Sequence, residues 1–192
     1  QYQLMILIMV QTGMRVGELV NFKINWINEP NNSLRIQANK KPIEWAPKRK
    51  SARAVPITDT LLNNLKKHIG KRTNGYLIQS PKTKTTVVRN GVKITKKTYR
   101  RYSYRSIIKI MNALFIETLG YKPQDESTHL FRHTYASRLL KDKIDVESIR
   151  KLLGHSDIKT TWLYIQGLPD FNAWDEVRKV DVMNLNVKLK IN

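Results

Sequence analysis

Residues 153–166 read LGHSDIKTTWLYIQ, and this stretch contains a helix end, a turn and the start of a new helix. Gly154 is typical of a helix end, because glycine adopts the left-handed backbone that closes a helix. Asp157 can cap the next helix by accepting a hydrogen bond from an exposed backbone N–H. His155 then lies in the turn, and Tyr164 lies on the second helix. Most tyrosines with an apolar flank are core or interface residues. Tyr164 is nevertheless the candidate nucleophile, because of what the rest of the sequence supplies.

The composition points to an anionic partner. The chain has 192 residues, with 35 Lys and Arg against 15 Asp and Glu, a formal net charge of +20 and a pI near 10.2. Such a surplus repels itself unless anions balance it, and nucleic acid is the leading partner. An anionic membrane is the alternative, but no basic segment has a long apolar face and no apolar run reaches about 18 residues. The lack of cysteine excludes disulfides and thiolate catalysis. It fits an intracellular protein, in the cytoplasm, the nucleoid or a virus-infected host cell.

The order of sequence patterns predicts one α+β domain over residues 1–192, mostly helical, with a small antiparallel three-stranded sheet in the N-terminal third. The expected strands are residues 33–38, 43–46 and 54–57. Asn90-Gly91, between residues 85–88 and 92–95, predicts an extra hairpin. Alternation over Leu185–Ile191 predicts a C-terminal strand that adds to a sheet edge, its own or a neighbour's.

Apolar periodicity predicts helices whose ends carry recognisable residues. The glycines expected at C-terminal ends are Gly13, Gly70, Gly120 and Gly154. The expected N-caps are Thr58 or Asp59, Thr128, Asp145 and Asp157. The chain opens with QYQLMILIMV, which resembles a buried helix already under way at residue 1. We therefore expect a further N-terminal part.

Two basic segments are candidate DNA contacts. The tip between the second and third expected strands reads PKRKSAR, and is either a solvated loop or a mobile finger that places one lysine on a phosphate. Residues 71–105 interleave basic and aromatic side chains, which suits contact with a DNA backbone and stacking on bases. The residues assigned to DNA contact are Arg49, Lys50, Arg53, Lys96, Lys97, Arg100 and Arg101.

The helix predicted over residues 129–140 places His129, Arg132 and His133 on one face. The two histidines have a spacing that could bind zinc. However, Leu130 stands where a helical zinc protease carries its glutamate, and no cysteine can complete a site. No metal is therefore expected.

Arg15 opens another predicted helix, and Glu18 lies on the same face. Glu18 could fix the guanidinium of Arg15 by a charge-assisted pair, although an ordinary solvated pair has the same spacing. Metal-free phosphoryl transfer needs guanidiniums on the phosphate oxygens, a proton donor for the departing oxygen and an activated nucleophile. The candidates for these roles are Arg15, Lys48, His129, Arg132, His155 and Tyr164.

Four motifs in this order resemble the catalytic domain of tyrosine recombinases, the phage integrase family. They are TGMRVGEL at 12–19, Lys48 eight residues before Pro56, HLFRHT at 129–134, and LGHSD followed by TTWLY at 153–164. The last two are the most specific. Together the motifs cover about residues 12–166.

The resemblance implies site-specific DNA recombination, integration or excision, without ATP, metal or another cofactor. Tyr164 would attack the scissile phosphate and form a 3′-phosphotyrosyl link. The freed 5′-hydroxyl would later rejoin a different strand. Arg15 and Arg132 would clamp the phosphate.

The remaining roles are implied in the same way. Lys48 would be the general acid for the 5′ oxygen, with Lys50 as the alternative. His129 would assist proton transfer at the tyrosine, and His155 would donate to a phosphate oxygen. Glu18 and His133 would support these groups.

The resemblance also implies partners: double-stranded DNA, and a homo-oligomer, a tetramer on recombining DNA, that assembles through the tail 168–192. An N-terminal domain that helps encircle DNA would lie outside this chain. Two alternatives remain. One is DNA relaxation of the type IB topoisomerase kind, which uses the same residue types. The other is a DNA-binding module whose active site has decayed.

Overall fold

The computed structural model describes residues 1–38, 44–47, 52–80, 83–89, 91–98, 100–123 and 127–161. Its first half contains α1 (Tyr2–Thr12), α2 (Val16–Val20), the 3-10 helices η1 (Ile24–Trp26) and η2 (Glu29–Asn31), the strands β1 (Ile27–Asn28), β2 (Ser33–Ile36) and β3 (Arg53–Pro56), and α3 (Asp59–Ile69). The second half contains β4 (Thr83–Arg89), β5 (Val92–Thr98), α4 (Tyr104–Leu119), α5 (Ser127–Lys141) and α6 (Val146–Leu153). The predicted α+β class, mostly helical with a small antiparallel sheet, is confirmed.

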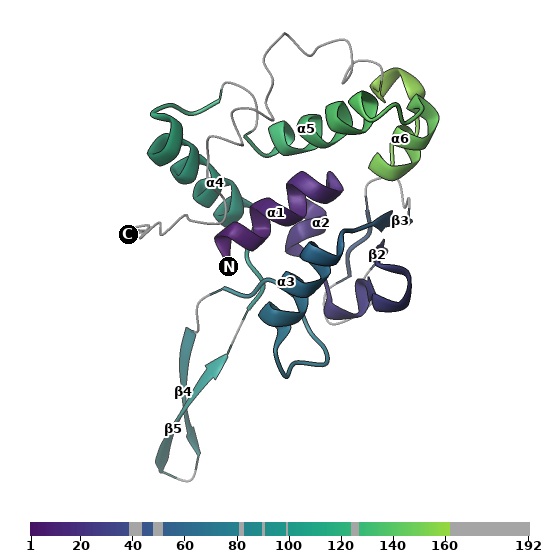
Figure 1. Cartoon of the computed structure of the whole chain (residues 1–192). Coiled ribbons are helices and arrows are strands. Elements are labelled where there is room, and N and C mark those ends of the chain that lie inside the picture. Colours follow the sequence, from purple (N-terminus) through teal and green to yellow (C-terminus); the bar gives the residue numbers. More distant parts are fainter. Residues whose placement is uncertain are drawn as a thin grey trace.

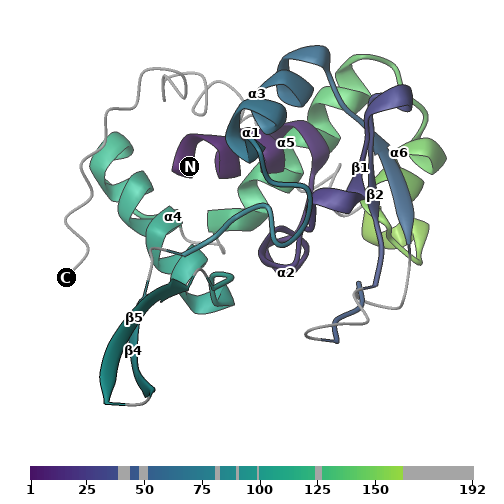
Figure 2. The ribbon, with the colours of Figure 1, turned by 90° about the horizontal axis from the view of Figure 1, so that it is seen from below.

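The first helix forms the centre of the molecule. α1 is apolar around most of its circumference, and a helix of that kind is stable only when it is surrounded by protein. It packs against α5 on one side and α3 on the other, as Figure 1 and Figure 2 both show. Its buried side chains are Leu4, Met5, Ile6, Ile8, Met9, Val10 and Thr12.

The helix ends follow the predicted chemistry. Gly13, Gly120 and Gly154 end α1, α4 and α6 in the left-handed conformation, and Gly70 ends α3 with a positive φ. The predicted caps Thr58, Asp145 and Asp157 each accept a hydrogen bond from a backbone N–H of their own helix. Thr128 is an exception. α5 begins at Ser127, so Thr128 lies in its first turn and is buried.

The three-stranded sheet has the order β1–β2–β3, with both pairs antiparallel. The register pairs Leu34 with Ile27 on one side and Val55 on the other. Of the expected strands, 33–38 and 54–57 correspond to β2 and β3. Residues 44–47 hold only a bridge at Trp45, and the third strand is β1. β1 is too short to show alternation. Its pairing depends on the reversal through η2, which Asn32 closes with φ 40°.

The predicted hairpin is confirmed and is longer than expected. β4 and β5 pair from Thr83 with Thr98 to Arg89 with Val92, so a two-residue turn joins them. Gly91 in that turn has φ 73°, which glycine adopts without a steric penalty. Figure 1 shows the hairpin projecting from the helical body. The strands extend beyond the predicted ends because backbone hydrogen bonds continue there, although the added residues show no alternating apolar pattern.

No helix within the described ranges is long and apolar enough to cross a membrane. The strand expected over Leu185–Ile191 lies outside the described residues.

Candidate active site

A cavity of about 470 Å³ opens between α2, the start of α4, the first turns of α5 and the segment 44–47. It brings together four of the predicted site residues, which come from two distant parts of the chain. The residues that line the cavity are Arg15, Val16, Gly17, Glu18, Trp45, Ala46, Tyr104, Thr128, His129 and Arg132.

Arg15 stands at the N-cap of α2 with an extended backbone. Its backbone N–H donates to Oε2 of Glu18 over 2.8 Å, and its Nη1 lies 3.4 Å from Oε1 of the same carboxylate. Both contacts hold Arg15 at the entrance of the helix. Since the Arg15 side chain is only half-buried, its guanidinium can still meet a ligand from the cavity.

Glu18 is 1% exposed, which excludes the alternative that Arg15 and Glu18 form an ordinary solvated pair on the surface. Arg53 makes a two-pronged ion pair with it, Nη1 to Oε1 and Nη2 to Oε2, each at 2.8 Å. Burial alone would raise the pKa of Glu18. The opposing effects are together larger: the hydrogen bonds and positive charge of Arg53 lower this pKa, and so do the charge of Arg132 and the hydrogen bond from the Arg15 N–H. The pKa of Glu18 lies below its ordinary value, and the carboxylate stays ionised.

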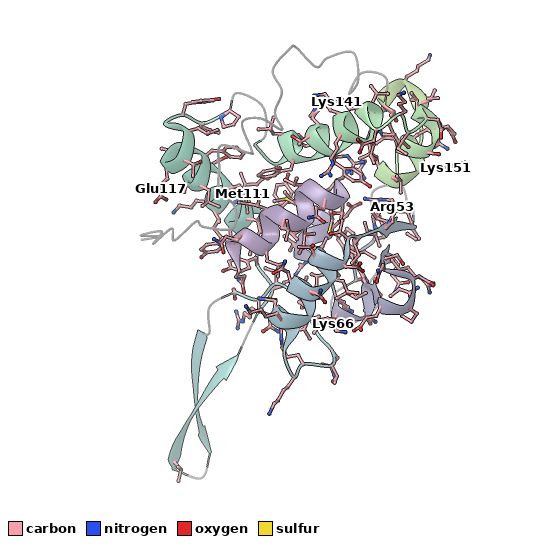
Figure 3. All side chains as sticks on the ribbon, in the orientation of Figure 1. Arg53, Lys66, Met111, Glu117, Lys141 and Lys151 are labelled. Atoms are coloured by element: carbon pink, nitrogen blue, oxygen red, sulfur yellow. The ribbon has the colours of Figure 1, made fainter. Side chains whose placement is uncertain are left out.

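Arg53 does not lie where the sequence analysis expected it. We predicted a DNA contact, but the side chain is buried, and its Nε donates to the backbone oxygen of Leu152 over 2.7 Å. Figure 3 shows Arg53 where β3 faces α6. Arg53 does not line the cavity, and its Nε, Nη1 and Nη2 atoms all donate to groups inside the protein, so the side chain does not present a donor to a DNA backbone. Arg53 instead ties α2, β3 and α6 together beneath the cavity.

Arg132 is 1% exposed and comes from α5. Its Nη1 donates to the carbonyl oxygen of Gly13 over 2.6 Å, and its Nη2 donates to that of Leu153. These oxygens stand at the C-terminal ends of α1 and α6, where helix dipoles concentrate partial negative charge. Two helix ends therefore orient the guanidinium at the wall of the cavity.

His155 follows Gly154 in the turn after α6 and is 5% exposed. Its backbone N–H donates to Arg150 O over 3.0 Å, and Arg150 Nη1 donates to the His155 oxygen over 2.6 Å. Burial lowers the pKa of His155 to about 3, assisted by the positive charges of Arg132, Arg15, Arg53 and Arg150. The imidazole is therefore neutral near pH 7 and can donate only one ring proton.

The other predicted residues are distributed as follows. His133 is half-buried and is not among the residues lining the cavity. Arg100 is exposed, and Arg101 donates to the Asn21 side chain over 2.6 Å. Lys48, Arg49, Lys50 and Tyr164 lie outside the described residues, and Lys96 and Lys97 are described only as backbone in β5.

Some cavity residues were missed by the sequence analysis. Tyr104 begins α4, where helical periodicity favours a core position, yet it is exposed and lines the cavity. Trp45 also lines it and packs on Trp26, with ring centroids 5.9 Å apart. The position of Trp45, an aromatic residue next to a basic loop in the sequence, could have indicated that it belongs to the site. No local pattern distinguishes Thr128 as part of the cavity wall.

Comparisons with known proteins give one family match and several similar proteins. The family model described as "Phage integrase family" matches residues 1–169. The tyrosine recombinase XerA of Pyrococcus furiosus is 29% identical over 84% of this chain and 49% of its own length. XerD of Rickettsia bellii is 30% identical over 83% of this chain and 50% of its own length. The chain thus spans about half the length of these curated relatives.

Solved structures share the fold. A crystal structure of XerA recombinase matches 90% of this chain and 55% of its own, with a TM-score of 0.60 and 23% identity. The catalytic domain of bacteriophage HP1 integrase matches 96% of this chain and 84% of its own, with a TM-score of 0.51 and 20% identity.

Proposed function

Because the chain belongs to the phage integrase family, we propose that it is the catalytic domain of a tyrosine-type site-specific DNA recombinase. It would break and rejoin double-stranded DNA through a 3′-phosphotyrosyl intermediate. The observation that carries this proposal is the cavity lined by Arg15, Arg132 and His129. The buried, neutral His155 lies close enough for the charges of Arg132 and Arg15 to help lower its pKa. The relatives compared above are named as recombinases, so topoisomerase-like relaxation is not favoured.

The two arginines supply the electrostatic part of the reaction. Guanidiniums bind the non-bridging oxygens of a phosphodiester in forked geometry, and stabilise the extra charge of the pentacoordinate transition state. Glu18 and the helix-end carbonyls fix both groups before the substrate arrives. No reorganisation is then needed during the reaction. A neutral His155 adds a third hydrogen-bond donor.

Tyr164 is the proposed nucleophile. Its oxygen attacks phosphorus, the bond to the 5′ oxygen breaks, and the DNA becomes linked to the protein through a 3′-phosphotyrosyl bond. Lys48 or Lys50 gives a proton to the departing 5′ oxygen, while His129 assists removal of the phenol proton. The reverse attack by a 5′-hydroxyl of another strand restores the DNA and frees the tyrosine. The energy of the original bond is kept in the covalent link.

The remaining surface supports DNA binding and assembly. The exposed Arg100 and the basic segments with Arg49, Lys50, Lys96 and Lys97 would contact the DNA backbone, which carries the negative charge that a +20 chain requires. The tail 168–192 would join protomers in a tetramer on recombining DNA. A domain that precedes these residues would also bind the duplex and help to encircle it.

The experiment is a cleavage assay on nicked DNA that carries the natural recombination site, or a library of sites, in EDTA. We expect a covalent protein–DNA band on a denaturing gel that is absent from Tyr164→Phe. Tyr121→Phe is the matched control, since Tyr121 is exposed and outside the cavity lining, and should form the band normally. A band that survives in Tyr164→Phe would show that another residue is the nucleophile. DNA binding without a band, also with the preceding domain present, would favour a module that only binds.

A further inference from the structure

The imidazole of His155 meets a buried threonine. The Nδ1 atom of His155 lies 2.9 Å from Oγ1 of Thr161, and both side chains are buried. Thr161 belongs to a helical turn at residues 158–161, which Asp157 begins by accepting the N–H of Lys159. This contact joins the turn that carries His155 to the helical turn at residues 158–161, which ends three positions before Tyr164 in the sequence.

A neutral imidazole has one ring proton, so this hydrogen bond can form in two opposite ways. In the first, the threonine hydroxyl donates to Nδ1, and the proton of His155 stays on Nε2. In the second, Nδ1–H donates to the threonine oxygen, and Nε2 presents a lone pair. Only the first form can donate a hydrogen bond from Nε2 to an anionic phosphate. In the second form, the lone pair on Nε2 would repel the phosphate.

We propose that Thr161 is a positioning residue that donates its hydroxyl proton to Nδ1 of His155 and thereby keeps a proton on Nε2 for a phosphate oxygen. The role of His155 towards phosphate rests on the proposed function. The direction of the bond from Thr161 does not, because it is a property of the protein without DNA.

Other threonines of the protein show what Thr161 would otherwise do. The hydroxyls of Thr12, Thr118 and Thr134 each donate to the carbonyl oxygen four residues earlier in their helix, over 2.6, 2.7 and 2.9 Å. A threonine that does so would have to accept from Nδ1. Thr161 Oγ1 lies instead at hydrogen-bond distance from the imidazole.

The backbone around His155 is fixed independently of Thr161. Arg150 holds the carbonyl of His155, and Glu147 holds Arg150 through two contacts of 2.7 and 2.6 Å. The position of the residue is therefore set by Arg150, while the tautomer and ring orientation are set by Thr161. A change at Thr161 should alter proton placement without moving the turn.

The first test reads the tautomer directly. The chain contains four histidines, so ¹⁵N spectra of histidine-labelled protein near pH 7 are simple, and His155→Gln assigns the resonances of interest. We expect a protonated Nε2 and an unprotonated, hydrogen-bonded Nδ1 in the wild-type protein. A protonated Nδ1 would overturn the proposal whatever the protein does to DNA.

The second test compares variants in the covalent-band assay. Thr161→Val removes the hydroxyl at nearly constant volume and should slow formation of the band by about tenfold or more at equal DNA affinity. Thr161→Ser keeps the hydroxyl and should stay within about threefold of the wild-type rate. Thr160→Val, at the exposed neighbour, is the matched control and should change nothing.

A rate for Thr161→Val equal to that of the wild type would overturn the proposal. So would equal losses in Thr161→Val and Thr161→Ser, since packing alone would then explain them. If the wild-type protein forms no band, the proposed function fails, and the spectra alone decide which atom carries the proton.

Discussion

At the scale of single residues, burial separates two ion pairs of the same length. Arg53 and Glu18 are 2.8 Å apart with side chains 5% and 2% exposed, whereas Lys66 and Glu29 are 2.8 Å apart with both side chains 53% exposed. Figure 3 shows Lys66 on α3, away from Arg53. Water screens the second pair but not the first, so the same distance has different energetic consequences.

Arg53→Met should therefore destabilise the fold by about 3–5 kcal/mol, because it leaves the carboxylate of Glu18 buried without its main partner. Lys66→Met should cost less than about 1 kcal/mol. Urea unfolding of both variants gives the comparison. Equal losses would contradict the assignment of Arg53 as an internal support of the cavity.

The sequence predicted the charged residues that line the cavity better than the residues that hold them in place. Arg15, His129 and Arg132 were found because their residue types and spacing match a known catalytic pattern. The contacts of Arg53 with Glu18 and of Thr161 with His155 were not found. Arg53 and Glu18 are far apart in the chain, and the contact of Thr161 with His155 depends on how one turn directs two side chains. Neither contact can be predicted from the periodicity of a single segment.

At the scale of elements, capping chemistry predicted the helix ends, while strand pairing was only partly predictable. Gly13, Gly120 and Gly154 mark helix ends because the required backbone angle is a property of one residue. The pairing of β1 with β2 is a property of two segments and the turn between them. A two-residue strand such as Ile27–Asn28 has no pattern of its own.

The hairpin permits a test of the DNA-contact proposal. Residues 83–98 contain Lys84, Arg89, Lys93, Lys96 and Lys97 and no acidic residue. Replacing them with a short turn should leave the unfolding free energy almost unchanged, because the hairpin projects from the body. It should weaken DNA binding and flatten its dependence on salt concentration, as expected when phosphate contacts are lost.

The control for this deletion exchanges the five basic residues for glutamine and keeps the hairpin. It should reproduce the loss of affinity if charge is responsible. An affinity for DNA that neither variant changes over a range of salt concentrations would place the binding surface elsewhere on the molecule.

At the scale of the whole molecule, three helices converge at Gly13. A Cβ atom there would lie 2.6 Å from Cδ1 of Tyr135 in α5 and 2.9 Å from Cδ2 of Leu153 in α6, and its φ of 59° disfavours any side chain. The carbonyl of the same glycine accepts the bond from Arg132. The close packing of α1, α5 and α6 and the orientation of the Arg132 guanidinium thus both depend on Gly13.

Gly13→Ala should combine backbone strain with a steric clash, and destabilise the fold by about 2–4 kcal/mol. Gly120→Ala is the matched control, because its φ is 78° but nothing lies within 4 Å of the added Cβ. Gly120→Ala should destabilise the fold by about 1 kcal/mol, through backbone strain alone. Urea unfolding measures both. Identical losses would mean that contact with Tyr135 and Leu153 is unimportant.

The hydrogen bond from Arg132 to Gly13 joins residues 119 positions apart, and its companion reaches Leu153 at the end of α6. Because the ribosome synthesises α1 well before α6, the two contacts that orient Arg132 cannot both form until the chain through Leu153 has left the exit tunnel. Under the proposed function, a nascent or truncated chain that lacks α6 would therefore carry basic segments that attract DNA, without an assembled site with which to cut it.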